Sequence, residues 1–230
     1  MIGLAFSGGK DSWSCLQLYK DQLEDITVLW VNTGKNFPEA LQSVELAKAI
    51  CPNFIEIKVD SEAQINAYGL PSDIVPCANT MLGETITGKV EQRVQAYFNC
   101  CYENIAKPLH AKAKELGITH MISGKRNDEG HLSSHSNGEE ADGIIQLHPN
   151  ENMTKQNVLD YLKSVMEVPK HFYLEHSSLD CYDCSAYLKD TKDISEWAKI
   201  NHPLLYKEKM IKVNKVKDIL MQEMTLGFGD

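Results

Sequence analysis

The sequence predicts an α/β fold with a doubly wound, mostly parallel sheet. Two observations lead to this prediction. Short apolar runs alternate with amphipathic stretches along residues 2–166, and alternating strands and helices build such sheets. Several of the runs are also apolar throughout, as strands buried on both faces are. With 230 residues, 43% of them hydrophobic, the chain is long enough for one sizeable core.

The elements follow one another in a regular order. The apolar runs predict strands at 2–6, 26–31, 54–59, 120–123 and 144–147. The amphipathic stretches predict helices at 10–24, 38–50, 94–115 and 154–166, the last of them capped by Thr154 or Asn152. Residues 66–93 and 125–143 are polar and aperiodic, so we expect loops over the active face there.

The domain organisation is predicted to be simple. We expect one nucleotide-binding α/β domain, residues 1–176, and a cysteine-bearing helical segment, residues 177–230, that packs on it. Within that segment, the locally basic stretch 207–217 is interpreted as a solvated helix face.

Charge and hydrophobicity limit the compartment and the partners. The first residues lack the features of a signal peptide, and no stretch approaches the roughly 20 apolar residues that span a bilayer. We therefore expect a cytoplasmic protein without a membrane partner. The net charge of −9 argues against nucleic acid as a substrate without excluding it. A homo-oligomer is left open.

The first motif with chemical meaning follows the first predicted strand and opens a helix. Glycines there allow the backbone to approach an anion, and amides at the helix start point towards it. A lysine adds a positive charge, two serines add hydroxyl donors, and an aspartate is suited to holding a Mg²⁺ that bridges phosphate oxygens. The motif therefore predicts a phosphate or sulfate site, although its spacing is not that of a Walker loop. Its residues are Ser7, Gly8, Gly9, Lys10, Asp11 and Ser12.

Two further segments come directly after predicted strands. Ligands bind at the carboxyl ends of parallel strands, so we expect Thr33 and Gly34, within residues 32–39, to contact the nucleotide. Arg126 follows a later strand in the run Gly124-Lys125-Arg126. Its guanidinium would bind phosphate or sulfate through two parallel hydrogen bonds, with Lys125 beside it.

The cysteines form a second, independent signal. In a reducing compartment the seven cysteines are not expected to pair as disulfides. Cys100 and Cys101 are adjacent, and 79 residues separate them from Cys181-x-x-Cys184. Adjacent residues on a helix lie about 100° apart, so both thiolates reach a common centre only if that centre is large, like an iron–sulfur cluster, or if the helix is distorted.

Two alternatives to a cluster remain open for these four cysteines. Four thiolates also form tetrahedral zinc sites, and unligated buried cysteines are the other possibility. Cys15 and Cys51 are predicted to be buried as small hydrophobic residues. Cys77 lies in a polar segment and is a candidate for a reactive thiol.

Taken together, these motifs resemble the phosphoadenylylsulfate (PAPS) reductase family. The first motif is similar to the PP-loop of the adenine nucleotide alpha hydrolases, which have a Rossmann-like fold of the HUP class. Residues 32–39 look like the family segment Asp-Thr-Gly-x-x-Phe-Pro-Glu, with Asn32 in place of the aspartate. The spacing of Cys100, Cys101, Cys181 and Cys184 is similar to that of adenylylsulfate (APS) reductases, whose four thiolates hold a 4Fe-4S cluster.

The resemblance implies a reaction. A family member binds APS or PAPS at the loop, a thiolate attacks sulfur, AMP or its 3′-phosphate derivative leaves, and thioredoxin or glutathione releases sulfite. The cluster polarises the sulfate without changing its own redox state. On this resemblance Lys10, Arg126 and Cys77 are the expected catalytic residues.

This chain also departs from the family pattern. The reductases take sulfite from the nucleotide with a cysteine in a C-terminal tail, whereas no cysteine follows Cys184 here. The basic residue expected four positions after the cysteine pair is Ile105. We therefore keep two alternatives: an ATP-dependent sulfur-transfer enzyme that uses Mg²⁺ and releases pyrophosphate, and a non-catalytic nucleotide-binding subunit that carries the cluster or zinc.

Overall fold

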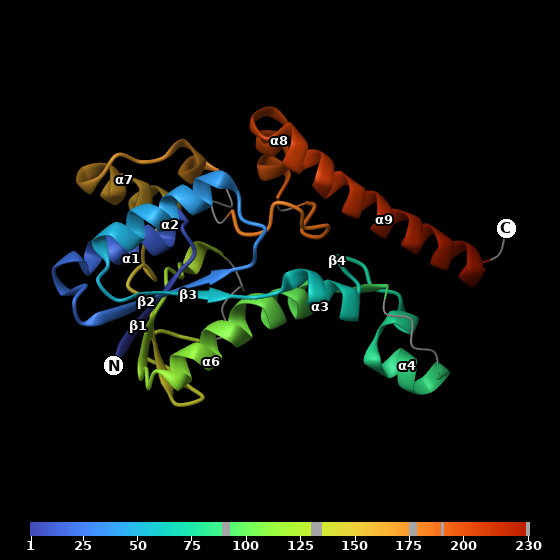
Figure 1. Cartoon of the computed structure of the whole chain (residues 1–230), viewed down its shortest axis with the longest axis horizontal. Helices are drawn as coiled ribbons and strands as arrows, with labels where there is room; N and C mark the ends of the chain where they lie inside the picture. The colour runs from blue at the N-terminus through green and yellow to red at the C-terminus, as the bar shows by residue number, and fades with distance from the viewer. Residues whose placement is uncertain (89–92, 130–134, 175–178, 190, 229–230) are drawn as a thin grey trace. The chain divides into compact units, whose positions relative to one another are not determined.

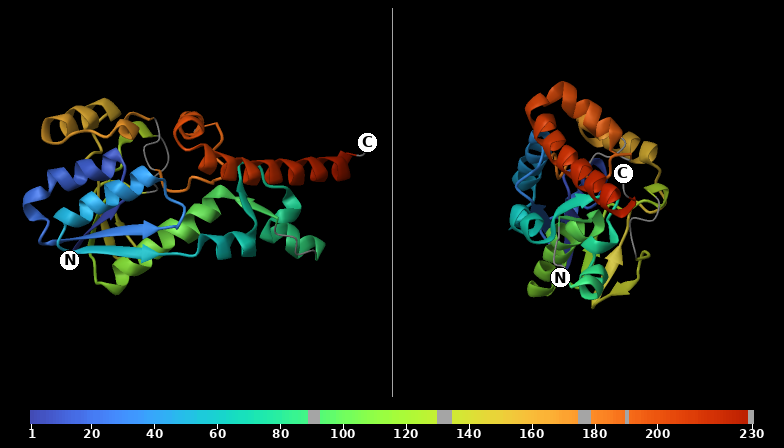
Figure 2. Two further views of the ribbon diagram at one scale, coloured as in Figure 1. Left: turned by 45° about the horizontal axis from the view of Figure 1, so that its top comes forward. Right: turned by 90° about the vertical axis from the view of Figure 1, so that its right-hand side faces the viewer.

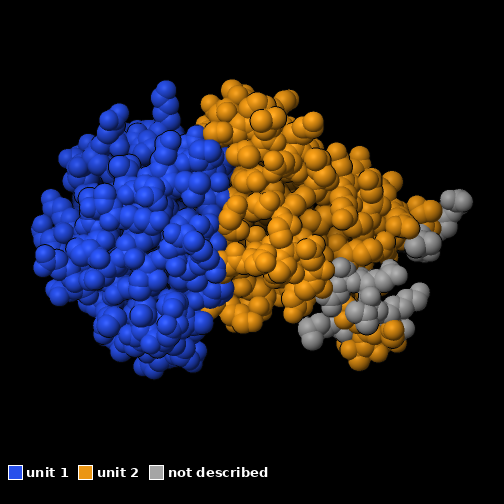
Figure 3. Space-filling view, in the orientation of Figure 1, with its two compact units in different colours: residues 1–32, 36–58, 108–180 blue, residues 33–35, 59–107, 181–230 orange. Residues whose placement is uncertain are grey.

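The computed structural model describes residues 1–88, 93–129, 135–174, 179–189 and 191–228. They form two compact units, coloured separately in Figure 3. Unit 1 comprises residues 1–32, 36–58 and 108–180, and unit 2 comprises 33–35, 59–107 and 181–230. This grouping differs from the division expected at residue 176, because residues 59–107 join the C-terminal segment in unit 2.

Unit 1 contains a six-stranded sheet in the order β3-β2-β1-β6-β8-β7. Five strands are parallel, and β7 pairs antiparallel with β8 at one edge. The sheet begins in the middle and grows first to one side and then to the other, which is the doubly wound topology. Its strands are β1 (Ile2–Phe6), β2 (Ile26–Asn32), β3 (Phe54–Lys58), β6 (His120–Ile122), β7 (Glu140–Ala141) and β8 (Ile144–Leu147).

Helices cover both faces of this sheet (Figures 1 and 2). On one face α1 (Lys10–Leu18), α2 (Pro38–Ile50) and α7 (Lys155–Val165) bury side chains such as Leu16, Val44 and Leu162. On the other face α6 (Lys107–Glu115) contributes Ala113 to a second cluster with Leu29, Met121 and Ile144. Burial on both faces explains why the strands are apolar throughout, and it confirms the predicted fold class.

The ends of these helices follow local sequence signals. Pro38 occupies the start of α2, where its missing N–H costs nothing. Thr154 caps α7 as predicted: its hydroxyl accepts from the Asn157 amide, and the Asn157 side chain accepts from the Thr154 amide. Helix α1 is shorter than predicted, since it ends at Leu18 and a 3₁₀ turn, η1 (Lys20–Gln22), follows it.

Unit 2 contains most of the elements that the sequence pattern did not predict. The segment expected to be a loop at 66–93 holds the end of α3, the strand β4, the 3₁₀ turn η2 and the helix α4. The single helix expected at 94–115 is a strand followed by α5, a π-helical turn and α6. Asp60 and Thr80 cap the two unpredicted helices. The elements are α3 (Ser61–Tyr68), β4 (Leu70–Ser72), η2 (Cys77–Asn79), α4 (Met81–Thr87), β5 (Val94–Ala96), α5 (Tyr97–Cys101), η3 (Tyr102–Ala106), α8 (Lys192–Asn201) and α9 (Pro203–Phe228).

The core of unit 2 joins segments that are distant in the sequence. Strands β4 and β5 pair in parallel, and their Leu70 and Val94 pack with Val216 and Ile219 of α9. The close approach of β4 and β5 requires glycine at position 69, since a Cβ there would meet the Arg93 backbone at 2.4 Å and the φ angle is +92°. In the part of the chain that the structure describes, no helix has the length and apolar character needed to cross a membrane.

Candidate functional sites

The predicted phosphate loop, residues 7–12, lies in unit 1 where the direction of the sheet's growth reverses. It joins β1 to α1, and the segment Gly124-Lys125-Arg126 follows β6, the strand next to β1. In doubly wound sheets this switch point, at the carboxyl ends of the strands, is where ligands bind. The loop and Arg126, predicted separately from the sequence, therefore belong to one site.

The loop backbone is held in an open turn. Gly8 has a φ angle of +79°, a conformation that side chains disfavour. The Ser43 hydroxyl donates to the Gly8 carbonyl at 2.7 Å and accepts from the Trp13 indole. Gly9 is the N-cap residue of α1 and supplies no side-chain cap. The start of α1 is thus fixed by packing from α2, without a capping side chain over its first turn.

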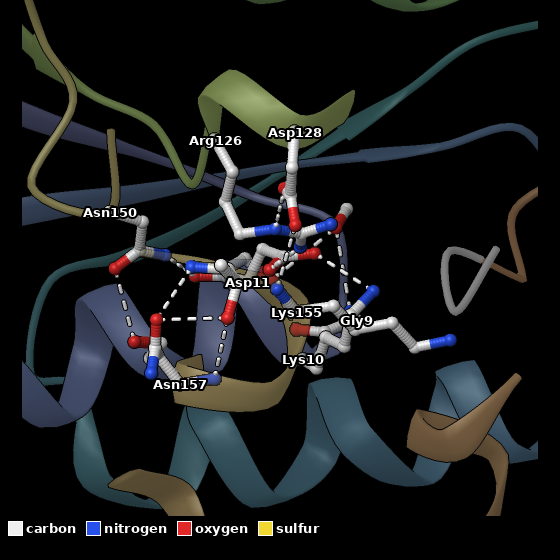
Figure 4. A network of polar contacts seen from close by, with 12 residues as sticks. Gly9, Lys10, Asp11, Arg126, Asp128, Asn150, Lys155 and Asn157 are labelled. Carbon is white, nitrogen blue, oxygen red and sulfur yellow. Dashed lines mark hydrogen bonds and ion pairs between the residues drawn. The ribbon is translucent and has the colours of Figure 1, made fainter. Parts of the chain in front are cut away.

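Charged side chains converge on Asp11 (Figure 4). Its carboxylate forms an ion pair with the Arg126 guanidinium and a second one, at 3.1 Å, with the Lys10 ammonium. Lys10 is 2% exposed and Arg126 is 4% exposed. Two cations with so little solvent contact require anionic partners, and in this structure Asp11 lies between them.

Asp128 holds the other side of Arg126. It accepts from the Arg126 Nε at 2.8 Å and from the Lys155 backbone amide at 2.9 Å, at the start of α7. Burial opposes the charge of Asp128, but these bonds outweigh it, so the pKa of its carboxyl is lowered. Arg126 is therefore fixed between an aspartate of the loop and an aspartate tied to α7.

Two buried contacts join the neighbouring segments to the first turn of α1. A Cβ on Gly124 would lie 2.6 Å from the Asp11 carbonyl carbon, so only glycine allows the two backbones to approach this closely. Asn150 donates to the Asp11 carbonyl at 3.0 Å and accepts from the Ser14 hydroxyl at 3.1 Å. Sequence patterns did not single out Asn150, because it lies outside every motif.

Lys125 does not share the ion pairs of Arg126 and makes a different contact. Its ammonium donates to the His135 carbonyl at 2.7 Å. Burial and the charge of Lys125 lower the pKa of His148, whose Nδ1 lies 2.8 Å from the Ser123 hydroxyl oxygen. Contact between Lys125 and a nucleotide stays a prediction.

The cysteine site lies within unit 2. All four of the predicted ligands, Cys100, Cys101, Cys181 and Cys184, line one cavity of about 60 Å³. Long-range folding therefore brings the adjacent pair and the Cys-x-x-Cys pair together, as the sequence spacing required. Cys77 does not line this cavity and is exposed on η2.

The helix that carries the adjacent pair is distorted at that point. Helix α5 ends at Cys101 and continues as the π-helical turn η3. Such turns occur often at functional sites. Within η3, the buried Asn104 amide donates to the Cys100 carbonyl at 2.9 Å and to its sulfur at 3.5 Å. The distortion was one of the two conditions under which adjacent cysteines could face a common centre.

The four cysteines surround one cavity without forming a site for a single ion. Among the residues that the structure describes, no three cysteine, histidine or acidic side chains lie close enough to hold one metal ion. All four cysteines nevertheless line one cavity, and a multi-atom cluster would need such a convergence. Four soft thiolate donors match iron–sulfur clusters and zinc in chemistry.

Lysines and carboxylates surround the cysteine cavity. Lys35 and Lys212 line it. Lys212 pairs with Asp183 at 2.7 Å and with Glu62 at 3.0 Å, and Lys35 pairs with the same two carboxylates. Burial works against the Lys212 charge, but Asp183 and Glu62 outweigh it and raise its pKa.

Burial raises the pKa of two of the four thiols, those of Cys100 and Cys184. Burial, together with Cys184, raises the pKa of Cys100 to about 11, although the Asn104 bond and Lys212 act in the opposite direction. Burial also raises the pKa of Cys184, while the charge of Lys209 lowers it. Ligation requires thiolates, so a bound cation would have to displace these protons.

The segment after β2 belongs to this second site. The Thr33 hydroxyl lies 3.8 Å from the Cys181 sulfur, and the Thr33 carbonyl accepts from Ser61 at 2.9 Å. The Lys35 carbonyl accepts from the Tyr182 amide. The structure thus groups Thr33 and Lys35 with the cysteines in unit 2, and the predicted nucleotide contacts of Thr33 and Gly34 stay predictions.

The basic stretch 207–217 was interpreted as a solvated face, and this was wrong for two of its lysines. Lys209 is 5% exposed, and Lys212 lines the cysteine cavity. Sequence reasoning missed both because the stretch lies in α9, which packs on segments more than 100 residues earlier in the chain. The predictions that Cys15 and Cys51 are buried are confirmed.

Comparison with known families identifies the domain. The model of the phosphoadenosine phosphosulfate reductase domain matches residues 1–187. This chain belongs to that family. Members of the phosphoadenosine phosphosulfate reductase family are nucleotide-using proteins that bind adenine nucleotides, so the resemblance inferred from the motifs is confirmed. No match was found among curated proteins.

Several solved structures match this chain at low sequence identity. The NMN synthetase of Francisella tularensis is 15% identical, with a TM-score of 0.52 over 83% of this chain and 71% of that one. A PAPS reductase from Candida auris in complex with phosphate is 16% identical, with a TM-score of 0.44 over 71% of each chain. The NH3-dependent NAD synthetase of Campylobacter jejuni is 15% identical, with a TM-score of 0.47 over 93% of this chain and 83% of that one.

Proposed function

We propose that this member of the phosphoadenosine phosphosulfate reductase family binds an adenylylated sulfate, APS or PAPS, at the phosphate loop and reduces it to sulfite. The observation that carries the proposal is the pair of buried cations, Lys10 and Arg126, at a helix start that has no capping side chain. Such a site favours a multiply charged oxyanion. We further propose that a 4Fe-4S cluster is held by the four cysteines of unit 2, in a protein of the cytoplasm.

Binding of the anion would replace one set of charged contacts by another. In the absence of a ligand, the Asp11 carboxylate forms ion pairs with Arg126 and Lys10. A phosphate or sulfate at the loop offers the same cations more oxygens, in the planar, two-bond geometry that a guanidinium prefers. Asp128 keeps Arg126 in place during the exchange, because its bond to the Arg126 Nε leaves the terminal nitrogens for the anion.

The reduction itself needs two electrons from thiols. In the proposed reaction a thiolate of the protein attacks the sulfur of the adenylylated sulfate, and the bond from that sulfur to the bridging oxygen breaks. AMP, or its 3′-phosphate derivative, leaves with the bonding pair. A thiolate of thioredoxin or glutathione then attacks the protein sulfur, sulfite leaves, and a second thiol reduces the mixed disulfide. Cys77, which is exposed, is our candidate for the protein nucleophile.

Cys100, Cys101, Cys181 and Cys184 would hold the cluster. When bound, a cluster supplies a concentrated charge that polarises a sulfate without transferring electrons to it. Asn104 contributes a hydrogen bond to a ligand sulfur, which is one of the ways in which proteins adjust cluster electronics. Zinc is the alternative occupant, with a purely structural role.

A second candidate function is ATP-dependent sulfur transfer. It is favoured by Asp11, a carboxylate in the first turn of α1 that is suited to a Mg²⁺ bridging phosphate oxygens. In that reaction ATP would adenylate a substrate and release pyrophosphate before sulfur is inserted.

One preparation tests these proposals together. The protein is purified without oxygen, its iron, sulfide and zinc are measured, and the same sample is titrated with APS, PAPS and ATP. Iron with tight sulfonucleotide binding and sulfite release supports the reductase. Iron with conversion of ATP to AMP and pyrophosphate, but no sulfite, supports sulfur transfer. Nucleotide binding without turnover identifies a binding subunit, and zinc alone refutes the cluster.

Asp11→Ala separates the two enzyme proposals. The change should abolish binding of Mg-ATP if Asp11 holds the metal. Affinity for APS should be retained or increased if the loop binds a sulfonucleotide without Mg²⁺, because Asp11 no longer competes for Arg126 and Lys10. Isothermal titration with each nucleotide, with and without Mg²⁺, gives the answer. The exposed Asp25→Ala serves as the control and should change neither affinity.

A further inference from the structure

Lys209 is a buried cation without a carboxylate partner in the described part of the chain. Its side chain is 5% exposed on α9, and its ammonium donates at 2.8 Å to the hydroxyl of Ser195 on α8. A neutral hydroxyl cannot balance the charge of an ammonium that has left water, and a buried unpaired charge costs several kcal/mol. Burial accordingly lowers the pKa of Lys209. An anion beside Lys209 would stabilise its charged form, and no carboxylate of the described residues supplies one.

The neighbouring group that becomes anionic on metal binding is Cys184. Lys209 and Lys212 are three residues apart on α9, so they lie on the same face of that helix. Lys212 lines the cavity of the four cysteines, which places this face of α9 at the cysteine site. Burial raises the pKa of Cys184, and the charge of Lys209 acts against that effect.

We propose that α9 supplies the positive charge that balances the thiolate-bound group of the cysteine site, with Lys209 acting on the Cys181–Cys184 side and Lys212 on the Cys100–Cys101 side. This inference depends on the proposed occupation of that site. Four thiolates bring four negative charges, more than the net positive charge of a 4Fe-4S core with its sulfides, or of a zinc ion, neutralises. A buried lysine next to a ligand sulfur offsets part of that excess and favours retention of the group.

The placement of these lysines explains two features of the sequence. Position 105, where the family resemblance leads us to expect a basic residue, is Ile105, which lines the same cavity. The helix α9 lies beyond residues 1–187, which match the family domain. A positive charge absent from the helix after the cysteine pair is thus provided from the C-terminal helix.

The test compares three variants of the full chain, each purified without oxygen in the metal-loaded form. Lys209→Met removes the charge and keeps the length of the side chain. Lys209→Gln also removes the charge but keeps a donor for Ser195. Lys207→Met, an exposed lysine two positions earlier on α9, is the control. The measurements are the rate of metal loss to excess chelator, the midpoint potential where iron is bound, and the thermal midpoint of the metal-free protein.

We expect both Lys209 variants to lose metal about 10-fold to 100-fold faster than the wild type, the usual effect of removing a residue that supports metal ligands. The midpoint potential should become more negative, because a nearby positive charge has been lost. The metal-free protein should melt at the same temperature or higher, since replacing a buried charge by an apolar side chain is neutral or stabilising. Lys207→Met should change none of these quantities.

Two results would overturn the proposal in distinguishable ways. If the loaded wild type and both Lys209 variants lose metal at the same rate, α9 does not balance the site, although the site itself stands. If Lys209→Met lowers the melting temperature of the metal-free protein and leaves metal loss unchanged, Lys209 is a packing residue. A wild-type protein purified without iron or zinc would instead refute the proposed cysteine site.

Discussion

Asn150 is predicted to be the residue whose loss most affects the phosphate loop without touching a ligand. Asn150 is 0% exposed. It accepts a hydrogen bond from the hydroxyl of Ser14, which is also 0% exposed. Asn150→Ala removes two hydrogen bonds, each contributing about 0.5–1.5 kcal/mol, and leaves the Ser14 hydroxyl buried without its acceptor, at a cost of about 1–3 kcal/mol. These contributions overlap, so we expect a loss of about 3 kcal/mol in the free energy of unfolding.

Thermal and urea unfolding measure this loss. For a chain of this size, about 3 kcal/mol corresponds to a fall of roughly 6–12 °C in the melting temperature. Asn152→Ala, an exposed asparagine on the same segment, should change stability by less than about 0.5 kcal/mol. Because Asn150 also holds the Asp11 carbonyl, Asn150→Ala should weaken binding of phosphate or sulfonucleotide, which titration calorimetry detects.

A double-mutant cycle provides the strictest check. In Ser14→Ala combined with Asn150→Ala the orphaned hydroxyl no longer exists, so the double variant should be less destabilised than the sum of the single variants, by about 1 kcal/mol or more. Additive effects, or a loss below about 1 kcal/mol for Asn150→Ala alone, would refute the account of this buried contact.

Further predictions concern the loop, a helix cap and the buried thiols. Gly124→Ala should destabilise the protein by about 1–3 kcal/mol and weaken oxyanion binding, because the new methyl group meets the Asp11 backbone; unchanged titration and melting curves would contradict this. Thr154→Ala should cost about 1 kcal/mol through loss of the α7 capping box, measured by urea unfolding, whereas an unchanged midpoint would argue against the cap. Burial raises the pKa of Cys51 to about 11, so the folded thiol stays protonated where the unfolded one ionises. Stability should therefore fall as pH rises from about 9 to about 11, by up to about 1.4 kcal/mol per pH unit for this thiol, and Cys51→Ala should reduce that slope in melts across this range. In metal-free protein at pH 8, alkylation followed by mass spectrometry should modify the exposed Cys77 much faster than Cys100, whose pKa is raised to about 11; equal rates would contradict the burial of Cys100.

The sequence predicted unit 1 well because its signals are local. Strands buried on both faces must be apolar, which marks β1, β2 and β8 directly. The prediction of the phosphate loop also rests on a local signal, since an anion site at a helix start needs a short, fixed order of glycines and polar residues. Binding of an anion there stays a prediction. Strand β7 was missed because two residues, Glu140 and Ala141, show no periodicity.

Unit 2 was less predictable because its packing is not local. Leu70 and Val94 lie in strands of three residues each, too short to show alternation, and their apolar partners belong to α9. The burial of Lys209 could not be predicted for the same reason. A lysine-rich stretch is interpreted as solvated unless the distant segments that pack around it are known. The four cysteines were identified from spacing alone, whereas the lysines and Asn104 around them have no spacing rule.

The order in which unit 2 is assembled along the chain has a consequence for biosynthesis. Residues 59–107 leave the ribosome long before residues 203–228, with which Leu70 and Val94 form a common core. Until α9 is made, Leu70 and Val94 cannot form their native apolar contacts with it, and exposed apolar side chains promote aggregation. Cys100 and Cys101 are also made before Cys181 and Cys184, so their thiols are open to oxidation during that time. Insertion of the proposed cluster at all four cysteines would have to follow completion of at least residue 184. Pausing during synthesis should therefore reduce the yield of folded protein more strongly than for a domain whose core is built from consecutive segments.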